Sequence, residues 1–214
     1  SLYGESHTWW QSVVAHDALA DVDVARKLLE EARRRFEQIA RPHSVLALLG
    51  GALTQQVSQL ADIAGRPELL LDVLGGYDSV EFETIQELLS LRRHELSLEE
   101  FLRRRGYQGP QQGEISSFSW REDPSPVTAL LQSLDADSNP AIEIAAERAR
   151  KRVTAETRLS RELGSVQRLW ARWLFREAAR MLPQRETGKA AMTLCLDAAR
   201  ACVRRLGADF SERG

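Results

Sequence analysis

Two cations at helical spacing are the residues best suited to bind an anion. Arg185 and Lys189 lie four residues apart in a stretch that predicts a helix beginning after Pro183. At that spacing both side chains project from one face of a helix. Near a helix start the positive end of the backbone dipole disfavours cations unless an anion is close. The pair therefore indicates either an anion or phosphate clamp or two solvated surface charges, and the residues alone leave both open.

Other kinds of chemical site find little support. The histidines are scattered, with no cysteine or carboxylate at metal-ligand spacing: His7, His16, His43 and His94. No nucleophile elbow, P-loop or dinucleotide fingerprint occurs. Cys195 and Cys202 fall about two turns apart on one predicted helix, too far to bridge, and we expect buried thiols. We expect no metal in this chain and no catalysis by the chain alone.

Composition and charge narrow the class of protein. The chain has 214 residues, of which 43% are hydrophobic and 28% charged, as in folded globular domains. A formal net charge of -2 gives no overall attraction for nucleic acid or an anionic membrane. The Arg-rich region 144–180 is interleaved with glutamates, which weakens its case as a nucleic-acid surface. With neither a membrane span nor a signal-peptide pattern, we expect a cytoplasmic protein without nucleic-acid or membrane partners.

Apolar residues recur at three- and four-residue spacing along most of the chain, and no convincing period-two alternation occurs. This predicts an all-α fold, an irregular domain of about eight to nine helices. We expect Pro42 and Pro183 to separate helices and Ser97 to Glu100 to form a capping box. We expect either Asp21 or Asp23 to cap the first helix and Gly65 to end the second. The expected helices are 21–40, 43–64, 68–74, 79–93, 97–105, 126–134, 140–163, 165–182 and 184–206.

One long segment near residues 106–124 has no helical pattern. Loops longer than about 12–15 residues in compact domains are usually functional or disordered. The aromatic residues Tyr107, Phe118 and Trp120 argue against disorder, so we expect one long ordered loop. Trp120 and Glu122 are either part of a functional motif or simple anchors that pin the loop to the helices, and anchoring is the commoner role of loop aromatics.

The order of these motifs resembles the central helical domain of phosphoenolpyruvate-synthase-like enzymes, especially rifampicin phosphotransferases. That domain carries G-H-R-G-P-G-E followed by P-R-W-x-E-x-P, to which this chain is similar at Gly106, Tyr107, Gly109, Glu114, Trp120 and Glu122. Near its end the domain has an R-E-x-x-K helix, which Arg185-Glu186-x-x-Lys189 resembles. The resemblance spans roughly the whole chain and is clearest from about residue 97 onward.

The resemblance implies that residues 1–214 are one helical, substrate-binding domain of a larger phosphoenolpyruvate-utilising phosphotransferase. Its partners would be an ATP-grasp domain and a domain whose histidine carries the phosphoryl group to a small-molecule substrate. The parent protein would use ATP and Mg, whereas this fragment would bind no cofactor and be inactive alone. Arg185 and Lys189 would lie where substrate meets phosphohistidine and would stabilise the transferring group.

The chain also departs from that family. Tyr107-Gln108 stands where the family has His-Arg, and two glutamines plus Gly113 precede Glu114 where the family has one glycine. A tyrosine can donate a hydrogen bond but cannot shuttle protons at neutral pH. Either the substrate differs from that of the typical member, or the domain has kept its scaffold and lost transfer. The rival interpretation is a free-standing helical interaction or regulatory domain with no catalysis, whose apolar grooves bind a partner protein.

Overall fold

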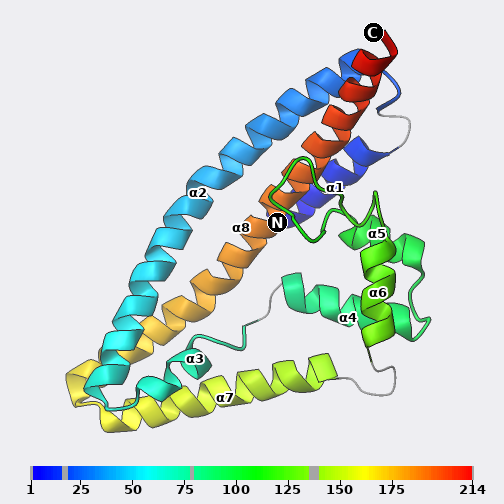
Figure 1. Cartoon of the computed structure of the whole chain (residues 1–214). Coiled ribbons are helices and arrows are strands. Elements are labelled where there is room, and N and C mark those ends of the chain that lie inside the picture. Colours follow the sequence, from blue (N-terminus) through cyan, green and yellow to red (C-terminus); the bar gives the residue numbers. More distant parts are fainter. Residues whose placement is uncertain (1, 16–18, 78–79, 135–139, 214) are drawn as a thin grey trace. The chain divides into compact units, whose positions relative to one another are not determined.

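A computed structural model describes residues 2–15, 19–77, 80–134 and 140–213. Within these ranges the chain forms eight α-helices, one 3-10 turn at Pro67–Leu69 and no strand (Figure 1). The all-α prediction is therefore confirmed. The helices are α1 (Leu2–Val14), α2 (Val22–Ile63), α3 (Leu70–Val73), α4 (Val80–Arg92), α5 (Leu98–Arg105), α6 (Ser125–Ser133), α7 (Pro140–Glu162) and α8 (Ser165–Arg213).

The chain divides into two compact units, each with its own core. Unit 1 comprises residues 1–42, 87–136 and 187–214, and unit 2 comprises residues 43–86 and 137–186. The helices α2, α4 and α8 each run from one unit into the other. The expectation that residues 1–214 form one domain of a larger protein stays a prediction.

Two predicted helix boundaries were wrong. Pro42 lies inside α2 and Pro183 lies inside α8, so neither proline separates two helices. An interior proline lacks one backbone hydrogen bond and costs about 3 kcal/mol. Apolar residues are buried on both sides of each proline, Ile39 and Leu53 in α2 and Ala178 and Ala191 in α8. Burial on both sides of each proline outweighs the local cost.

Other helix ends agree with the sequence. Asp21 caps α2, because its carboxylate accepts a hydrogen bond from the backbone N–H of Asp23 at 2.7 Å. Gly65 follows α2 with φ +66°, a conformation that glycine adopts without strain. The Ser97 hydroxyl accepts from the N–H of Glu100 at 3.1 Å. This is half of the expected capping box.

The other half of that capping box is replaced by ion pairs. The Glu100 carboxylate accepts hydrogen bonds from Arg103 and Arg104, both at 2.6 Å. These hydrogen bonds lower the pKa of Glu100 to about 2. Both arginines are exposed, so the pairs are modest contributors to stability.

Helix α1 was not predicted. Its buried face is Ser6, Trp10 and Val13, a helical spacing in which a polar residue occupies one of three positions. Trp10 is 1% exposed and belongs to a core cluster of unit 1. Because Ser6 interrupts the apolar spacing, the sequence pattern did not predict this helix.

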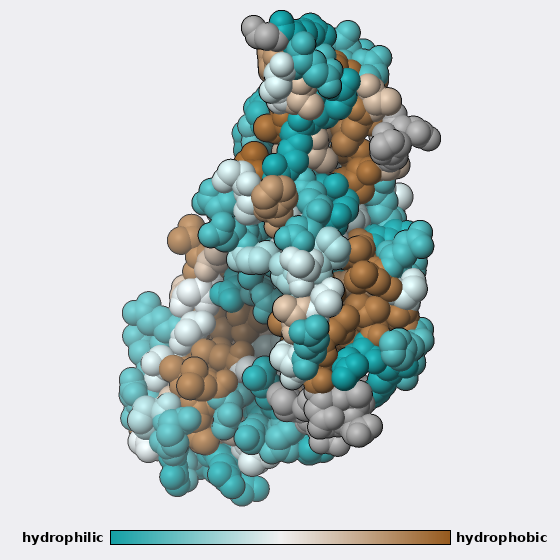
Figure 2. Space-filling model, turned by 45° about the vertical axis from the view of Figure 1, so that its right-hand side comes forward, coloured by the Kyte–Doolittle hydropathy of each residue, from teal (hydrophilic) through white to brown (hydrophobic). Residues whose placement is uncertain are grey.

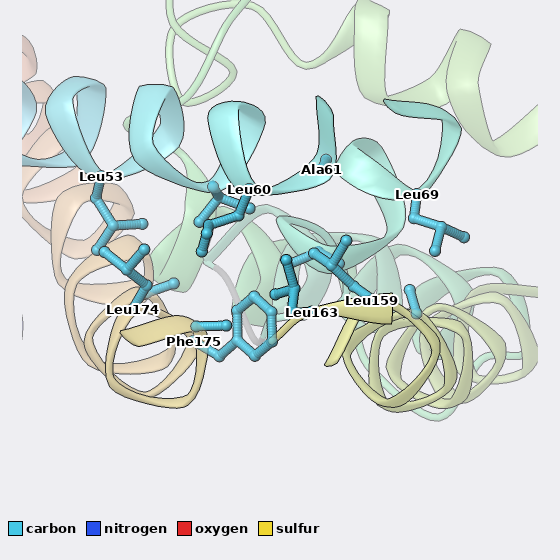
Figure 3. Close-up of a cluster of buried hydrophobic side chains, with 13 residues drawn as sticks. Leu53, Leu60, Ala61, Leu69, Leu159, Leu163, Leu174 and Phe175 are labelled. Atoms are coloured by element: carbon cyan, nitrogen blue, oxygen red, sulfur yellow. The ribbon is translucent and has the colours of Figure 1, made fainter. Parts of the chain in front are cut away.

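The core of unit 2 is formed where three helices pack together (Figure 3). Each contributes a periodic row of apolar side chains, and the short α3 adds Val73. The rows are Leu53, Val57 and Leu60 from α2; Ala155 and Leu159 from α7, with Leu163 directly after its end; and Ala171, Leu174 and Phe175 from α8. This packing fixes the first half of α8 in place.

In unit 1 the second half of α8 is the central element. Its residues Leu194, Ala198 and Cys202 pack with Trp10 of α1 and Tyr107 of the loop. Both cysteines are buried free thiols, as expected. Burial raises the pKa of Cys195 and of Cys202 to about 11. None of the described helices combines the length and apolarity of a membrane span.

Candidate functional site

The loop between α5 and α6 is closed at its base by backbone hydrogen bonds. The N–H of Trp120 donates to the Gln108 carbonyl at 2.7 Å, and the N–H of Arg121 donates to the Gly106 carbonyl at 2.9 Å. The two limbs approach this closely because Gly109 has no side chain. A Cβ there would lie 2.8 Å from the Phe118 carbonyl oxygen. The segment is thus a closed, internally bonded loop.

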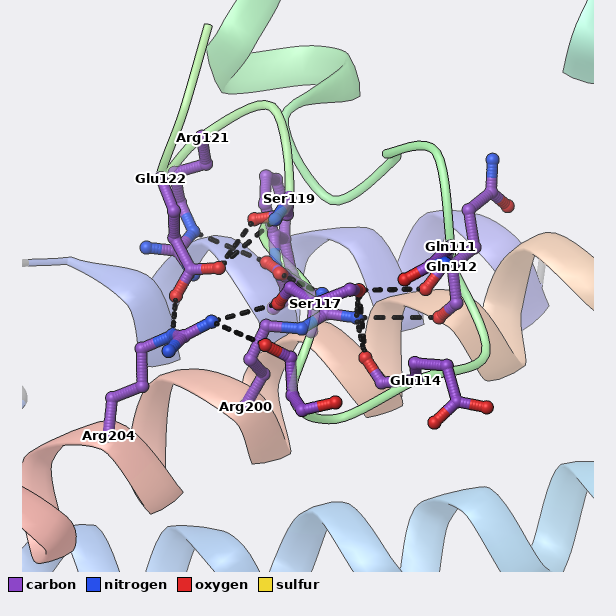
Figure 4. A network of polar contacts seen from close by, with 12 residues as sticks. Gln111, Gln112, Glu114, Ser117, Ser119, Arg121, Glu122, Arg200 and Arg204 are labelled. Carbon is purple, nitrogen blue, oxygen red and sulfur yellow. Dashed lines mark hydrogen bonds and ion pairs between the residues drawn. The ribbon is translucent and has the colours of Figure 1, made fainter.

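A buried ion pair on α8 lies under this loop (Figure 4). Arg200 Nη1 and Asp197 Oδ1 are 2.8 Å apart, and the two side chains are 1% and 0% exposed. The other carboxylate oxygen of Asp197 accepts hydrogen bonds from the indole N–H of Trp10 at 2.8 Å and from Arg121 Nε at 3.2 Å. A buried carboxylate is costly unless it is paired in this way. Asp197 therefore joins α1, the loop and α8.

Two arginines of α8 hold the far side of the loop. Arg200 Nη2 donates to the Glu114 carbonyl at 2.8 Å. Arg204 forms an ion pair with Glu122 at 2.6 Å and donates to the Ser117 carbonyl at 2.8 Å. Its guanidinium also lies 4.4 Å from the centre of the Phe118 ring, a cation–π contact. These contacts bind both limbs of the loop to one helix.

Most of the loop residues singled out from the sequence act as anchors. Tyr107 is 1% exposed, and its ring meets Trp10 edge-on with centroids 5.6 Å apart. Its hydroxyl lies 3.2 Å from the hydroxyl of Tyr3. Trp120 packs on Phe101 at 5.9 Å. These side chains point into the core.

Glu122 and Glu114 play different parts. The Glu122 carboxylate accepts from the backbone N–H of Ser119 at 3.1 Å in addition to pairing with Arg204. Glu114 is exposed, and it is its carbonyl, not its carboxylate, that Arg200 holds. The loop thus presents Glu114 at a surface while its backbone is fixed.

A second arginine–carboxylate pair supports the same region. Arg105, at the end of α5, is 6% exposed and contacts Glu87 of α4 through two nitrogens, at 2.8 and 3.2 Å. Its third nitrogen donates to the Tyr3 hydroxyl at 3.3 Å. The start of the loop is therefore tied to α1 and α4 by a forked, partly desolvated contact.

Arg185 and Lys189 lie far from either end of α8, so the expectation that they sit in the first turns of a helix was wrong. The dipole argument does not apply in a helix interior. Arg185 is exposed and pairs with Glu186 at 3.1 Å. Lys189 is exposed as well, and its carbonyl accepts from the Thr193 hydroxyl. Arg185 belongs to unit 2 and Lys189 to unit 1.

Sequence reasoning missed Asp197, Arg200 and Arg204. The available signal was weak: a charged pair three residues apart on the face that also carries Leu194 and Ala198. Within the described part of the chain, no group of three or more His, Cys, Asp or Glu side chains could hold a metal ion.

Comparison with known proteins identifies the family. The family model of the rifampicin phosphotransferase fourth domain matches residues 25–186, more than half of the chain. The match includes the whole loop and Arg185, and it ends before Lys189 and the Asp197–Arg200 pair. No curated protein and no solved structure matches the chain. The suspected resemblance is confirmed, and the chain belongs to the family of rifampicin phosphotransferase fourth domains.

Proposed function

We propose that this chain is the substrate-binding helical domain of an ATP-dependent phosphotransferase. In this proposal a phosphohistidine on another domain of the same protein delivers the phosphoryl group to a small molecule. The family match over residues 25–186 carries the proposal, because it covers both the loop and the Arg185 segment. ATP and Mg would be bound elsewhere in the parent protein.

The construction of the loop supports a binding role. Its backbone is held by the base hydrogen bonds and by Asp197, Arg200 and Arg204, while the side chains of residues 110–111 and 113–116 are exposed. A binding segment that is already ordered loses less conformational entropy when a ligand arrives. Rigid support from a helix is also what precise positioning requires. In this proposal the exposed tip, with Glu114, contacts the substrate.

Arg185 and Lys189 are the cations that we assign to the transferring phosphoryl group. A guanidinium can donate two parallel hydrogen bonds to phosphate oxygens, and an ammonium can supply a second positive charge. Phosphoryl transfer is accelerated mainly by positioning and by such charge stabilisation. Arg185 is already exposed on α8, with only its sequence neighbour Glu186 as an ion-pair partner among the described residues.

The test uses the full-length parent protein. Arg185→Ala and Lys189→Ala are made singly and together, with Arg26→Ala, an exposed ion-paired arginine of α2, as the control. Phosphohistidine formation from labelled ATP and transfer to an acceptor, rifampicin first, are measured separately. Loss of one such donor typically lowers a rate about 10²–10³-fold. We expect transfer to fall while phosphohistidine formation and the control stay unchanged; unchanged transfer in the double variant would remove the assigned role.

The mass of the native polypeptide tests the parent protein itself. An antibody raised against this domain should detect, in an extract of the source cells, a band several times larger than 24.1 kDa. A band at 24.1 kDa would contradict the phosphotransferase proposal and favour a free-standing interaction or regulatory domain.

A further inference from the structure

Apolar residues reach the surface in several separate groups (Figure 2), and one group on α8 is strictly periodic. Val166, Leu169, Trp170 and Trp173 follow one another at helical positions i, i+3, i+4 and i+7. Their exposed fractions are 83%, 71%, 43% and 42%. We call these four residues the tryptophan stripe. By helical geometry it lies on the side of α8 opposite the core residues of that helix.

The tryptophan stripe lines a shallow groove. The rings of Trp170 and Trp173 are stacked, with centroids 4.7 Å apart and planes at 13°. The groove has a volume of about 530 Å³, and its remaining wall is formed by Arg172 and Arg176. Exposed tryptophans next to arginines are the composition found at the energetic centres of protein interfaces.

A row of positive charge runs beside the stripe. Arg172, Arg176 and Arg180 recur every four residues, so they share one side of α8. Glu177 is near both Arg176, at 3.4 Å, and Arg180, at 3.7 Å. For Arg172 no ion pair is found in the part of the chain that the structure describes. One carboxylate thus pairs with two of the three guanidinium groups, and the row keeps a positive excess.

We propose that the tryptophan stripe docks an acidic amphipathic helix from outside this chain. A stripe of i, i+3, i+4 and i+7 residues is the surface that a second helix packs against, with its own apolar side chains in the same spacing. Carboxylates flanking that apolar row would pair with Arg172, Arg176 and Arg180. The arginine row indicates that the partner is negatively charged, and the helical spacing of the stripe indicates that the partner is a helix.

The same charges argue against a second copy of the chain as the occupant. If two tryptophan stripes met face to face, their arginine rows would lie at the same interface and repel each other. The inference concerns a different surface from the loop and Arg185, and it does not depend on the proposed phosphotransferase function.

The test uses two synthetic peptides of about 20 residues, long enough to form a helix. Both carry leucine at i, i+3, i+4 and i+7; one has glutamates beside the leucines and the other has lysines. Binding to the chain is measured by calorimetry at low and physiological salt. We expect the glutamate peptide to bind one to one at micromolar concentrations, more weakly as salt rises, and the lysine peptide not to bind.

Variants of exposed residues then locate the contact. Leu169→Glu should weaken binding of the glutamate peptide at least tenfold. Val153→Glu, on α7 and also exposed, at 57% against 71% for Leu169, should leave it unchanged. The double variant Arg172→Glu with Arg176→Glu should reverse the preference toward the lysine peptide. Circular dichroism confirms that each variant is folded.

Four results would overturn the proposal. These are no binding of the glutamate peptide, equal binding of both peptides, and a dimer in sedimentation that Leu169→Glu dissociates. The fourth is binding to phosphatidylserine vesicles through the stripe without binding to either peptide, which would show a lipid surface as the occupant.

Discussion

Replacing Asp197 by alanine should destabilise unit 1 and loosen the loop together. The variant leaves Arg200, which is 1% exposed, as a buried cation without its carboxylate. It also removes the acceptor of the Trp10 indole N–H and of Arg121 Nε.

The size of the effect follows from these contacts. Removing one partner of a buried ion pair costs about 3–5 kcal/mol, because the remaining charge is uncompensated. Whole domains are stable by only about 5–15 kcal/mol. We therefore expect Asp197→Ala to lower the free energy of unfolding by about 3–5 kcal/mol. Asp197→Asn should cost less, because an amide oxygen can still accept from Trp10.

Urea unfolding followed by circular dichroism measures the loss, and hydrogen exchange of residues 106–124 reports on the loop. Glu37→Ala is the control, since Glu37 forms an exposed pair with Arg33 in the same unit and should change stability by less than about 1 kcal/mol. In a double-mutant cycle with Arg200→Met, the combined loss should be smaller than the sum of the single losses. A loss below about 1 kcal/mol for Asp197→Ala, or strict additivity, would refute the reasoning.

Three further predictions concern the loop and the thiols. Gly109→Ala should destabilise the chain by about 1–3 kcal/mol through collision with the Phe118 carbonyl, whereas Gly113→Ala, with open space around it, should be neutral in the same urea titration. Arg204→Ala should cost only about 1 kcal/mol, because its ion pair is partly exposed, yet should speed hydrogen exchange at residues 116–118; unchanged exchange would contradict its anchoring role. Cys195 and Cys202 should react with thiol reagents only as fast as the chain opens, and fast labelling of the native chain at pH 8 would count against their burial. The free energy of unfolding should fall as pH rises from about 9 toward 11, because the thiols ionise in the unfolded chain while the buried thiols, with pKa raised to about 11, stay protonated.

Local signals in the sequence were sufficient for most helices. The caps at Asp21 and Ser97 and the left-handed Gly65 are chemical features of single residues, so they could be read directly. Pro42 and Pro183 were misread for the opposite reason. A proline has a known local cost, but the burial that offsets it comes from residues far away in the sequence, which periodicity cannot weigh.

The candidate site was less predictable than the fold. The loop and its aromatic anchors were visible as an unusual composition, and the family resemblance identified the segment. The buried Asp197–Arg200 pair under the loop could not be predicted. Its partner Trp10 is 187 residues away from Asp197 in the sequence, and a charged residue on an apolar helix face can be interpreted only once its partners are known. The spacing of Arg185 and Lys189 was read correctly, but their place within one continuous helix was not.

The way α2, α4 and α8 run from one unit into the other has a consequence for synthesis. Unit 1 begins at the N-terminal end of these residues and is completed only by residues 187–214, so its core cannot close until α8 has emerged from the ribosome. Until α8 emerges, Trp10 and the loop lack their common partner Asp197. Unit 2, which ends at residue 186, can assemble first. Nascent α1 and the loop therefore present apolar surface until α8 has been made, and the emergence of that helix ends this exposure.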